Sequence, residues 1–376
     1  MGSSSNPFQP AEVRLLVRPA KAHISLAALQ ANLAQVNKCA PNSKIAAVVK
    51  ANAYGHGAEQ CATALEATSN ALAVACIDEA LSLRSAGIKA PILLLEGHFN
   101  AAELELAAKN EFWLMTHNGE QVQQVLDFKG MRELTIWLKV DTGMHRLGLT
   151  PDEFPKAHAA LTQAPHVAAP VVLATHFSSA EEPKVAVTSA QIDALAQLNR
   201  ASSIPMSLAN SAGILAHPTA HAEWVRPGIM LYGCSPLGQE HPQRSNTELN
   251  PVMSLRTEVI AVHDVAAGEG VGYGLKWRAG KPSKIATVAI GYGDGYPRSA
   301  PSGTPVLING QRAPLCGTVS MDMITVDITE LENVTIGSTA ELWGKELLVD
   351  EVAAMANTIS YELLTRMPAR VVREYS

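Results

Sequence analysis

Residues 44–57 read KIAAVVKANAYGHG, an apolar run that ends in a lysine and a glycine-containing loop. The run Ile45–Val49 is short, apolar and bounded by polar residues, which is typical of a buried strand. A helical pattern follows at Ala58–Ala67. A strand followed by a covering helix is the repeating unit of a parallel sheet, so this stretch predicts an α/β fold.

The same alternation continues through the first two-thirds of the chain. Further strand candidates are Ala71–Cys76, Ile92–Leu95, Phe112–Met115, Leu134–Val140, Val171–Thr175, Pro205–Ala209 and Trp224–Val225. Helical patterns occupy Leu26–Val36, Asp78–Ser85, Ala101–Lys109, Gly119–Phe128, Pro151–Gln163 and Val185–Arg200. Eight strand candidates in this arrangement favour an N-terminal (β/α)8 TIM-like barrel. An open, doubly wound sheet is the alternative, although no G-x-G-x-x-G motif follows the first strand.

A polar, turn-rich connector at Gln239–Asn250 separates this region from a different pattern. Beyond it, strand candidates alternate with Gly and Pro turns at Leu255–Val265, Lys284–Ile290, Thr304–Ile308, Met323–Ile328 and Thr339–Leu348. We therefore expect a C-terminal mainly β domain over residues 244–376, a barrel over 21–243, and an N-terminal segment, 1–20, that packs with the C-terminal domain.

The composition excludes several classes of protein. Hydrophobic residues make up 47% of the 376 residues and charged residues 17%, which excludes a disordered chain. The formal net charge of −6 does not suit a nucleic-acid-binding surface. No apolar run is long enough for a membrane helix, and the N-terminus lacks the apolar stretch of a signal peptide. We expect a cytoplasmic protein with neither nucleic acid nor membrane as a partner.

Cysteine and histidine spacing gives no indication of a disulfide framework or a metal site. The five cysteines are widely spaced and form no C-x-x-C motif. The one metal-like spacing, His217 to His221, is interrupted by Pro218, which spoils a helical pair. We therefore expect no bound metal.

Side chains at the carboxyl ends of barrel strands face the active site. This rule selects Lys50, Arg146, His176, Ser211 and Arg226, which lie at or just beyond the ends of strand candidates. A charged amine at the end of an apolar strand is expensive to bury, and a desolvated lysine is a nucleophile suited to an aldehyde. A strand-end lysine that reaches solvent is the alternative for Lys50.

A phosphate site is the second element. The loops after strands seven and eight of a barrel often hold phosphate, and they contain Ser211 and the pair Gly228 and Ile229. Alternatively, Ser211 is an ordinary helix N-cap. A lysine across the barrel mouth from a phosphate cradle fits an enzyme that uses pyridoxal phosphate.

The motifs VVKANAYGHG, KVDTGMHRLG, THFSS, NSAG, RPGIMLYG, VGYG, GYGDGY and CGTVSMDM resemble, in order and spacing, those of the alanine racemase family. The resemblance extends from about Val17 to the C-terminus. It implies a fold-type III enzyme that interconverts L-alanine and D-alanine with pyridoxal 5'-phosphate and supplies D-alanine for peptidoglycan. It also implies a homodimer whose active sites are shared between subunits.

The resemblance assigns a role to each candidate residue. Lys50 would carry the cofactor as an aldimine and act as one catalytic base, with Tyr273 of the partner subunit as the opposing base. Arg226 would face the pyridine nitrogen and His176 the ring, while Arg146 and Met321 would hold the substrate carboxylate. The phosphate-binding residues would be Tyr54, Ser211, Gly228, Ile229 and Tyr361. Lys139 matches a lysine that is carbamylated in some members, and Glu181 and Tyr292 match residues on the path of the substrate into the site.

Racemisation requires proton removal from one face of the α-carbon and proton return to the other, which supports two opposed bases. A racemase of broader substrate range and a fold-type III amino-acid decarboxylase remain alternatives, as does a non-enzymatic carrier of the cofactor. Two positions depart from the family pattern: Ser207 stands where certain racemases have a histidine, and Ser320 stands in place of a cysteine.

Overall fold

The computed structural model describes residues 18–183, 186–200 and 203–376, and they form two compact units. The barrel unit comprises Ser25–Val252 with Ser376, and the C-terminal unit comprises residues 253–375 together with residues 18–24. The two units thus divide at Ile24 and Val252, whereas the sequence pattern predicts boundaries at residues 21 and 244. Most of the N-terminal segment 1–20 lies outside the described residues.

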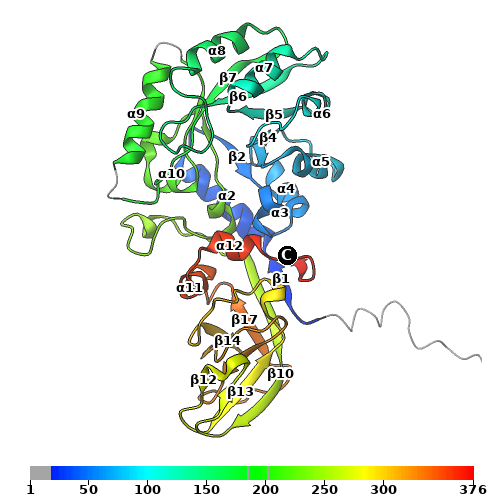
Figure 1. Ribbon diagram of the computed structural model, residues 1–376, viewed down its shortest axis with the longest axis vertical. Coiled ribbons are helices and arrows are strands. Elements are labelled where there is room, and N and C mark those ends of the chain that lie inside the picture. The colour runs from blue at the N-terminus through cyan, green and yellow to red at the C-terminus, as the bar shows by residue number, and fades with distance from the viewer. Residues whose placement is uncertain (1–17, 184–185, 201–202) are drawn as a thin grey trace, which may run out of the picture. The chain divides into compact units, whose positions relative to one another are not determined.

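The barrel unit is a closed ring of eight parallel strands, which confirms the predicted (β/α)8 architecture (Figure 1). The strands are β2 (Lys44–Val48), β3 (Ala71–Val74), β4 (Ile92–Leu94), β5 (Phe112–Thr116), β6 (Leu134–Lys139), β7 (Val167–Ala174), β8 (Met206–Ser207) and β9 (Trp224–Val225). The ring closes where Lys44 of β2 pairs with Trp224 of β9. Each of the eight expected runs overlaps one of these strands.

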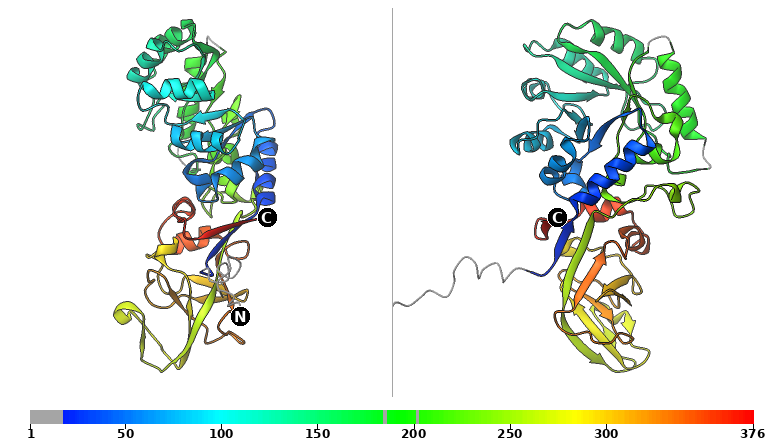
Figure 2. Two further views of the ribbon diagram at one scale, coloured as in Figure 1. Left: turned by 90° about the vertical axis from the view of Figure 1, so that its right-hand side faces the viewer. Right: turned by 180° about the vertical axis from the view of Figure 1, so that it is seen from behind.

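Helices cover the outside of the ring, as Figures 1 and 2 show for α5 to α9. They are α2 (Leu26–Cys39), α4 (Ala58–Glu66), α5 (Ile77–Ser85), α6 (Ala102–Asn110), α7 (Gly119–Asp127), α8 (Phe154–Gln163), α9 (Val187–Asn199) and α10 (Ser211–Ala216). Short 3-10 turns occupy Pro218–Ala220, Ile229–Tyr232 and Arg244–Asn246. Ser25 caps α2 by accepting a hydrogen bond from the Ala28 amide, as its position before the first apolar residue predicts.

Three tryptophans fill the interior of the barrel. The ring of Trp224 lies 5.4 Å from that of Trp113 and 5.3 Å from that of Trp137. Because β9 is hydrogen-bonded only to β2 and β8, these contacts with β5 and β6 cross the interior. Two of the three residues lie near the amino ends of their strands, which leaves the carboxyl ends as the place for a ligand.

The C-terminal unit is mainly β, as predicted, and is built on one long strand, β10 (Met253–Val265), drawn in yellow-green in Figure 2. The sheet order is β15-β14-β17-β10-β1-β18, with β13 on β10 and β16 on β13. The other elements are β1 (Lys21–Ile24), β11 (Gly270–Val271), β12 (Trp277–Arg278), β13 (Ser283–Val288), β14 (Pro305–Ile308), β15 (Gln311–Pro314), β16 (Ile324–Asp327), β17 (Thr339–Trp343), α11 (Val349–Met355), α12 (Ser360–Thr365) and β18 (Val372–Tyr375). Single 3-10 turns lie at Tyr273–Leu275 and Tyr292–Asp294.

The strand β1 belongs to this unit although it precedes the barrel in the chain. It pairs antiparallel with β10 and parallel with β18, so its backbone groups complete the sheet between them. Arg18 adds an ion pair with the buried carboxylate of Asp294 at 2.7 Å.

Within the described ranges, none of the helices combines the length and the hydropathy that a membrane span requires. The same residues contain no group of three or more His, Cys, Asp or Glu side chains that could hold a metal ion.

Candidate active site

Five basic side chains share the carboxyl end of the barrel. They are Lys50, Lys139, Arg146, His176 and Arg226. Burial and the positive charges of Arg226 and Arg146 lower the pKa of Lys139 to about 8. Burial, with the charges of Arg226 and Lys139, holds the pKa of His176 well below its usual value. This concentration of positive charge suits a ligand with several negative charges.

Arg226 is the most enclosed member of this cluster, with 4% of its surface exposed. Its Nη1 donates to Ser207 Oγ at 2.5 Å, and its Nη2 donates to the carbonyl oxygens of Thr175 at 2.7 Å and Leu208 at 3.2 Å. Nη2 also lies 3.5 Å from Nδ1 of His176. Burial lowers the pKa of Arg226 to about 10, so the guanidinium is charged at neutral pH and its direction is set by its acceptors.

The chain turns left-handed immediately after Lys50. Ala51, Asn52, Ala53 and Tyr54 have φ values of 52°, 54°, 52° and 51°. Each L-residue in this conformation costs about 1–2 kcal/mol relative to the right-handed helix, and none of the four is glycine. Such strain persists only where the surrounding structure holds it, and it concentrates at functional sites.

Two side chains hold this turn, Glu79 at its start and Asn52 further along. The carboxylate of Glu79, on the first turn of α5, accepts from the Ala51 amide at 2.6 Å with Oε1 and from the Ala75 amide at 2.8 Å with Oε2. Asn52 Oδ1 accepts from the Ala58 amide at 2.8 Å. The turn therefore rests on neighbouring elements and not on the intrinsic preference of its residues.

The end of the turn is held by aromatic packing. The Tyr54 ring stacks on that of Tyr232 with their centroids 4.8 Å apart, and Tyr232 Oη donates to the Val48 carbonyl at 2.8 Å. Burial raises the pKa of Tyr54 to about 12. Tyr54 consequently keeps its proton at neutral pH, so its hydroxyl is a hydrogen-bond donor.

Hydroxyl and amide groups meet at the loops after β8 and β9. Ser211 Oγ accepts from the amides of Gly228 at 2.8 Å and Met230 at 3.4 Å. A Cβ on Gly228 would lie 2.5 Å from Tyr54 Oη, so only glycine fits beside the tyrosine hydroxyl. The structure thus brings together Tyr54, Ser211, Gly228 and the adjoining Ile229, a set of donors whose chemistry fits a phosphate.

The alternative assignment of Ser211 as a helix N-cap is wrong. Asn210 is the N-cap of α10, because its side chain accepts from the Gly213 amide at 2.9 Å. The hydroxyl of Ser211 is thereby left to face the loop that contains Gly228.

Tyr273 lies in the C-terminal unit on a turn between two glycines. Gly272 and Gly274 have φ values of 73° and 72°, a conformation that favours glycine. Thr318 Oγ1 donates to the Tyr273 carbonyl at 3.2 Å, which anchors the turn to the next loop. The Tyr273 side chain is 72% exposed within this chain.

Met321 and Tyr292 lie together on adjoining loops of the same unit. The Tyr292 amide donates to the Ser320 carbonyl at 3.0 Å, and the Gly293 amide donates to the Met321 carbonyl at 2.8 Å. Both side chains are exposed. Tyr361 is half-buried on α12 of the C-terminal unit, whereas Glu181 is half-buried in the loop after β7 of the barrel unit. The predicted site residues are therefore divided between the two units.

Sequence reasoning missed Glu79 and Tyr232. Glu79 has the appearance of an ordinary first-turn acid of a helix, and Tyr232 that of a core aromatic in IMLY. No sequence signal could have found them, because the four residues between Lys50 and Gly55 include no glycine and give no indication of a left-handed turn.

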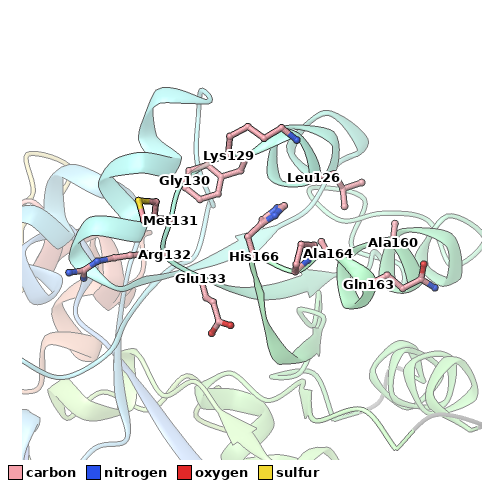
Figure 3. A pocket seen from close by; sticks show the side chains of 12 residues that line it. Leu126, Lys129, Gly130, Met131, Arg132, Glu133, Ala160, Gln163, Ala164 and His166 are labelled. Atoms are coloured by element: carbon pink, nitrogen blue, oxygen red, sulfur yellow. The ribbon is translucent and has the colours of Figure 1, made fainter.

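A pocket of about 700 Å³ lies at the opposite end of the barrel (Figure 3). Its lining comes from the segment Phe128–Glu133, which precedes β6, and from the end of α8 through His166, which precedes β7. No predicted site residue lines it. Because the amino ends of barrel strands serve stability more often than chemistry, the candidate site remains at the carboxyl ends.

Comparisons with known proteins cover most of the chain. The family model described as "Alanine racemase, N-terminal domain" matches residues 24–236, and "Alanine racemase, C-terminal domain" matches residues 252–375. The alanine racemase of Chromohalobacter salexigens is 49% identical over 358 residues, which cover 95% of this chain and 98% of that protein.

Two solved structures share the complete fold. The biosynthetic alanine racemase of Pseudomonas aeruginosa has a TM-score of 0.92 and 45% identity, covering 96% of this chain and 100% of that one. The alanine racemase of Bartonella henselae, solved with covalently bound pyridoxal phosphate, has a TM-score of 0.86 and 32% identity. That match covers 95% of this chain and 99% of the Bartonella chain.

Proposed function

The chain belongs to the alanine racemase family, and we propose that it interconverts L-alanine and D-alanine with pyridoxal 5'-phosphate as its cofactor. The observation that carries this proposal is the turn after Lys50, which sets the lysine at the barrel mouth and the Tyr54 hydroxyl against Gly228. One short segment thereby supplies to the same site an amine and a hydroxyl that can donate a hydrogen bond to a phosphate.

The donor set fits this cofactor. Lys50 would hold it covalently, while the hydroxyls of Tyr54 and Ser211 and the amides near Gly228 and Ile229 would receive its phosphate. Tyr361 would add a donor from the C-terminal unit. When bound, the cofactor withdraws electrons from the α-carbon of the substrate and makes its proton removable.

Arg226 and His176 would contact the ring of the cofactor. A guanidinium only donates hydrogen bonds, so Arg226 would leave the ring nitrogen unprotonated. Such a ring withdraws electrons more weakly than a protonated one, which favours return of the proton over side reactions. The packing of Arg226 against Ser207 and two carbonyl oxygens supports this role.

Lys50 and Tyr273 would be the two bases. One would remove the α-proton and the other would return a proton to the opposite face, because a single side chain does not reach both faces of a planar carbon. Tyr273 would come from the partner subunit, in agreement with its exposure within one chain.

Arg146 and Met321 would hold the substrate carboxylate, Arg146 by charge and Met321 through its backbone amide. Tyr292 and Glu181 would line the path of the substrate. Lys139, whose pKa is lowered to about 8, would be neutral often enough to attack carbon dioxide. A nitrogen–carbon bond would form, one proton would leave, and the resulting carbamate would lie among the cations of the site.

The active unit would be a homodimer with two shared sites. Several large apolar or aromatic side chains are exposed on the turns of the C-terminal unit. They are Tyr273, Leu275, Tyr292, Met321 and Met323. An exposed apolar patch of this kind marks an interface, and a two-fold dimer would cover it. Dilution should therefore lower the specific activity as dimers dissociate, and an active monomer would contradict the proposal.

The deciding experiment is chiral chromatography of L-alanine after incubation with the purified, cofactor-loaded protein. Conversion towards equal amounts of L- and D-alanine is expected. A yellow protein that produces no D-alanine would retain the cofactor assignment and shift the reaction to another amino acid or to decarboxylation. A barrel fragment, residues 1–243, that bound the cofactor and functioned as well as the full chain would instead favour a carrier.

We place the enzyme in the cytoplasm as a supplier of D-alanine for peptidoglycan. The chain is 45% identical to a Pseudomonas aeruginosa enzyme described as biosynthetic and 46% identical to a Pseudomonas putida enzyme described as catabolic, so the role has to be tested in cells. Expression of the chain in a bacterium that requires D-alanine should restore growth without the supplement. No growth with a well-expressed chain would contradict the proposal, because racemisation is reversible and any active racemase would supply D-alanine.

A further inference from the structure

Glu79 joins the carboxyl ends of two neighbouring barrel strands. Its Oε2 accepts from the amide of Ala75, which follows β3 directly, and its Oε1 accepts from the amide of Ala51, 28 residues earlier in the chain. The contact with Ala75 is local and stabilises the start of α5, as an acid on the first turn commonly does. The contact with Ala51 serves no purpose in α5 and therefore requires another explanation.

Ala51 is the first left-handed residue of the turn and the direct neighbour of Lys50. Asn52 and His56 hold later parts of the turn, through the Ala58 amide and through the carbonyl oxygens of Ala53 and Tyr54. Glu79, by contrast, holds the start of the turn, next to Lys50.

A change of Ala51 to the right-handed conformation would redirect the chain on both sides of it. The direction in which Lys50 leaves β2 and the distance from Lys50 to the Tyr54 hydroxyl would change together. The positions of the Lys50 amine and the Tyr54 hydroxyl are therefore coupled through the conformation of Ala51. The Glu79 carboxylate holds that conformation.

From this geometry we infer that Glu79 is a positioning residue for Lys50: its carboxylate holds the left-handed turn and so sets the reach of the lysine amine. The inference rests on the proposed function, in which Lys50 carries the cofactor and moves a proton. Glu79 would act through the backbone amide of Ala51 and not by contact with substrate or cofactor.

The test compares Glu79→Gln with Asp78→Asn in the full-length holoenzyme. Glutamine retains one acceptor oxygen but presents an NH2 group to the second amide, so one of the two contacts is lost. Asp78 is the exposed neighbour on the same first turn of α5, and its replacement removes the same charge from the same helix end. Glu79→Asp, which retains the charge but is too short to bridge both amides, serves if the glutamine variant folds poorly.

Three readouts are taken on protein with one cofactor per chain: kcat and KM for alanine, the visible circular dichroism of the bound cofactor, and the primary isotope effect with α-deuterated L- and D-alanine. For Glu79→Gln we expect a kcat lower by about 10- to 100-fold, as for a base displaced by about 1 Å, with little change in KM. The dichroism should change, and the isotope effect should rise in one direction of the reaction only, because one of the two bases is affected. Asp78→Asn should match the wild type in all three.

A Glu79→Gln holoenzyme with wild-type kcat, dichroism and isotope effects would overturn the inference. A lower thermal midpoint with unchanged values per bound cofactor would also overturn it, since Glu79 would then be merely structural. If the wild type produces no D-alanine, the proposed function fails separately, and the dichroism of the bound cofactor alone decides whether Glu79 orients the lysine.

Discussion

The hydroxyl of Ser207 lies between Arg226 and the backbone of β9. It accepts from Arg226 Nη1 at 2.5 Å and donates to the Trp224 carbonyl at 3.0 Å. Because its own hydrogen is directed at that carbonyl, the lone pairs of the hydroxyl face the guanidinium. Certain racemases have a histidine at this position, which could take up a proton. Ser207 holds Arg226 by a hydrogen bond but, unlike a histidine, cannot take up a proton.

Replacement of Ser207 by alanine should therefore disturb Arg226 without adding bulk. One buried donor of the guanidinium would lose its acceptor, and we expect a loss of about 1–2 kcal/mol in the free energy of unfolding. Urea unfolding measures this, with Ser82→Ala, an exposed serine on α5, as the matched control. Equal stability of the two variants would contradict the assigned contact.

Tyr273→Phe removes a hydroxyl that is exposed within the chain, so the fold should be unaffected. If Tyr273 is the second base, the initial rate of racemisation should fall by about 10²- to 10⁴-fold. Chiral chromatography gives the rate, while the thermal midpoint and the visible spectrum report the fold and the cofactor. Lys276→Gln, an exposed neighbour on the same turn, is the control. A phenylalanine variant that racemises at the wild-type rate would show that this hydroxyl is no base.

Lys139 should make stability depend on pH in the cofactor-free protein. Burial, with Arg226 and Arg146, lowers its pKa in the folded chain to about 8, whereas the ordinary value is 10.5. Below pH 8 both states hold the proton and the folded state bears the full penalty of the buried charge. Between about pH 8 and 10.5 the unfolded chain holds a proton that the folded chain has released. Stability should therefore rise with pH across this window, by about 3 kcal/mol at most.

The measurement is the free energy of unfolding against pH in buffer free of carbon dioxide, so that no carbamate forms. Lys139→Met is the comparison, because other groups that titrate in this range contribute equally to both proteins. The variant should be more stable below pH 8 and should lack the rise. Parallel curves for the two proteins would mean that the Lys139 amine is not perturbed.

The barrel could be predicted because its strands are buried on both faces, and each is therefore a short, continuous apolar run. The left-handed turn after Lys50 could not be predicted from the sequence. Alanine favours the right-handed helix, whereas Ala51 and Ala53 occupy the opposite conformation in a turn that Glu79 of α5 and the Asn52 side chain hold in place. Local preference and tertiary contact disagree there, and tertiary contact decides.

The same limit applies to long-range pairing. The sequence KAHI at residues 21–24 has no marked strand pattern, and its partners on β10 and β18 lie more than 200 residues away in the chain. Short hairpin strands such as β11 and β15 were missed because they depend on their turns more than on apolar residues. The candidate residues at strand ends could be selected, by contrast, because a closed barrel places all those ends together.

The carboxylate of Asp294, fully buried, fastens the loop that carries Tyr292. It accepts from Arg18 at 2.7 Å, from Arg370 at 2.8 Å and from the Gly291 amide at 2.9 Å. Asp294→Asn should lower the free energy of unfolding of the C-terminal unit by about 2–3 kcal/mol, because the amide NH2 would face donors and leave buried groups unpaired. Asp322→Asn is the control, since Asp322 pairs with the same Arg370 but is only half-buried, and it should cost less than about 1 kcal/mol. Hydrogen exchange of the amides in residues 291–294 locates the effect. Faster exchange there in the Asp294 variant alone is expected, and equal exchange in both would show that the buried carboxylate does not fasten this loop.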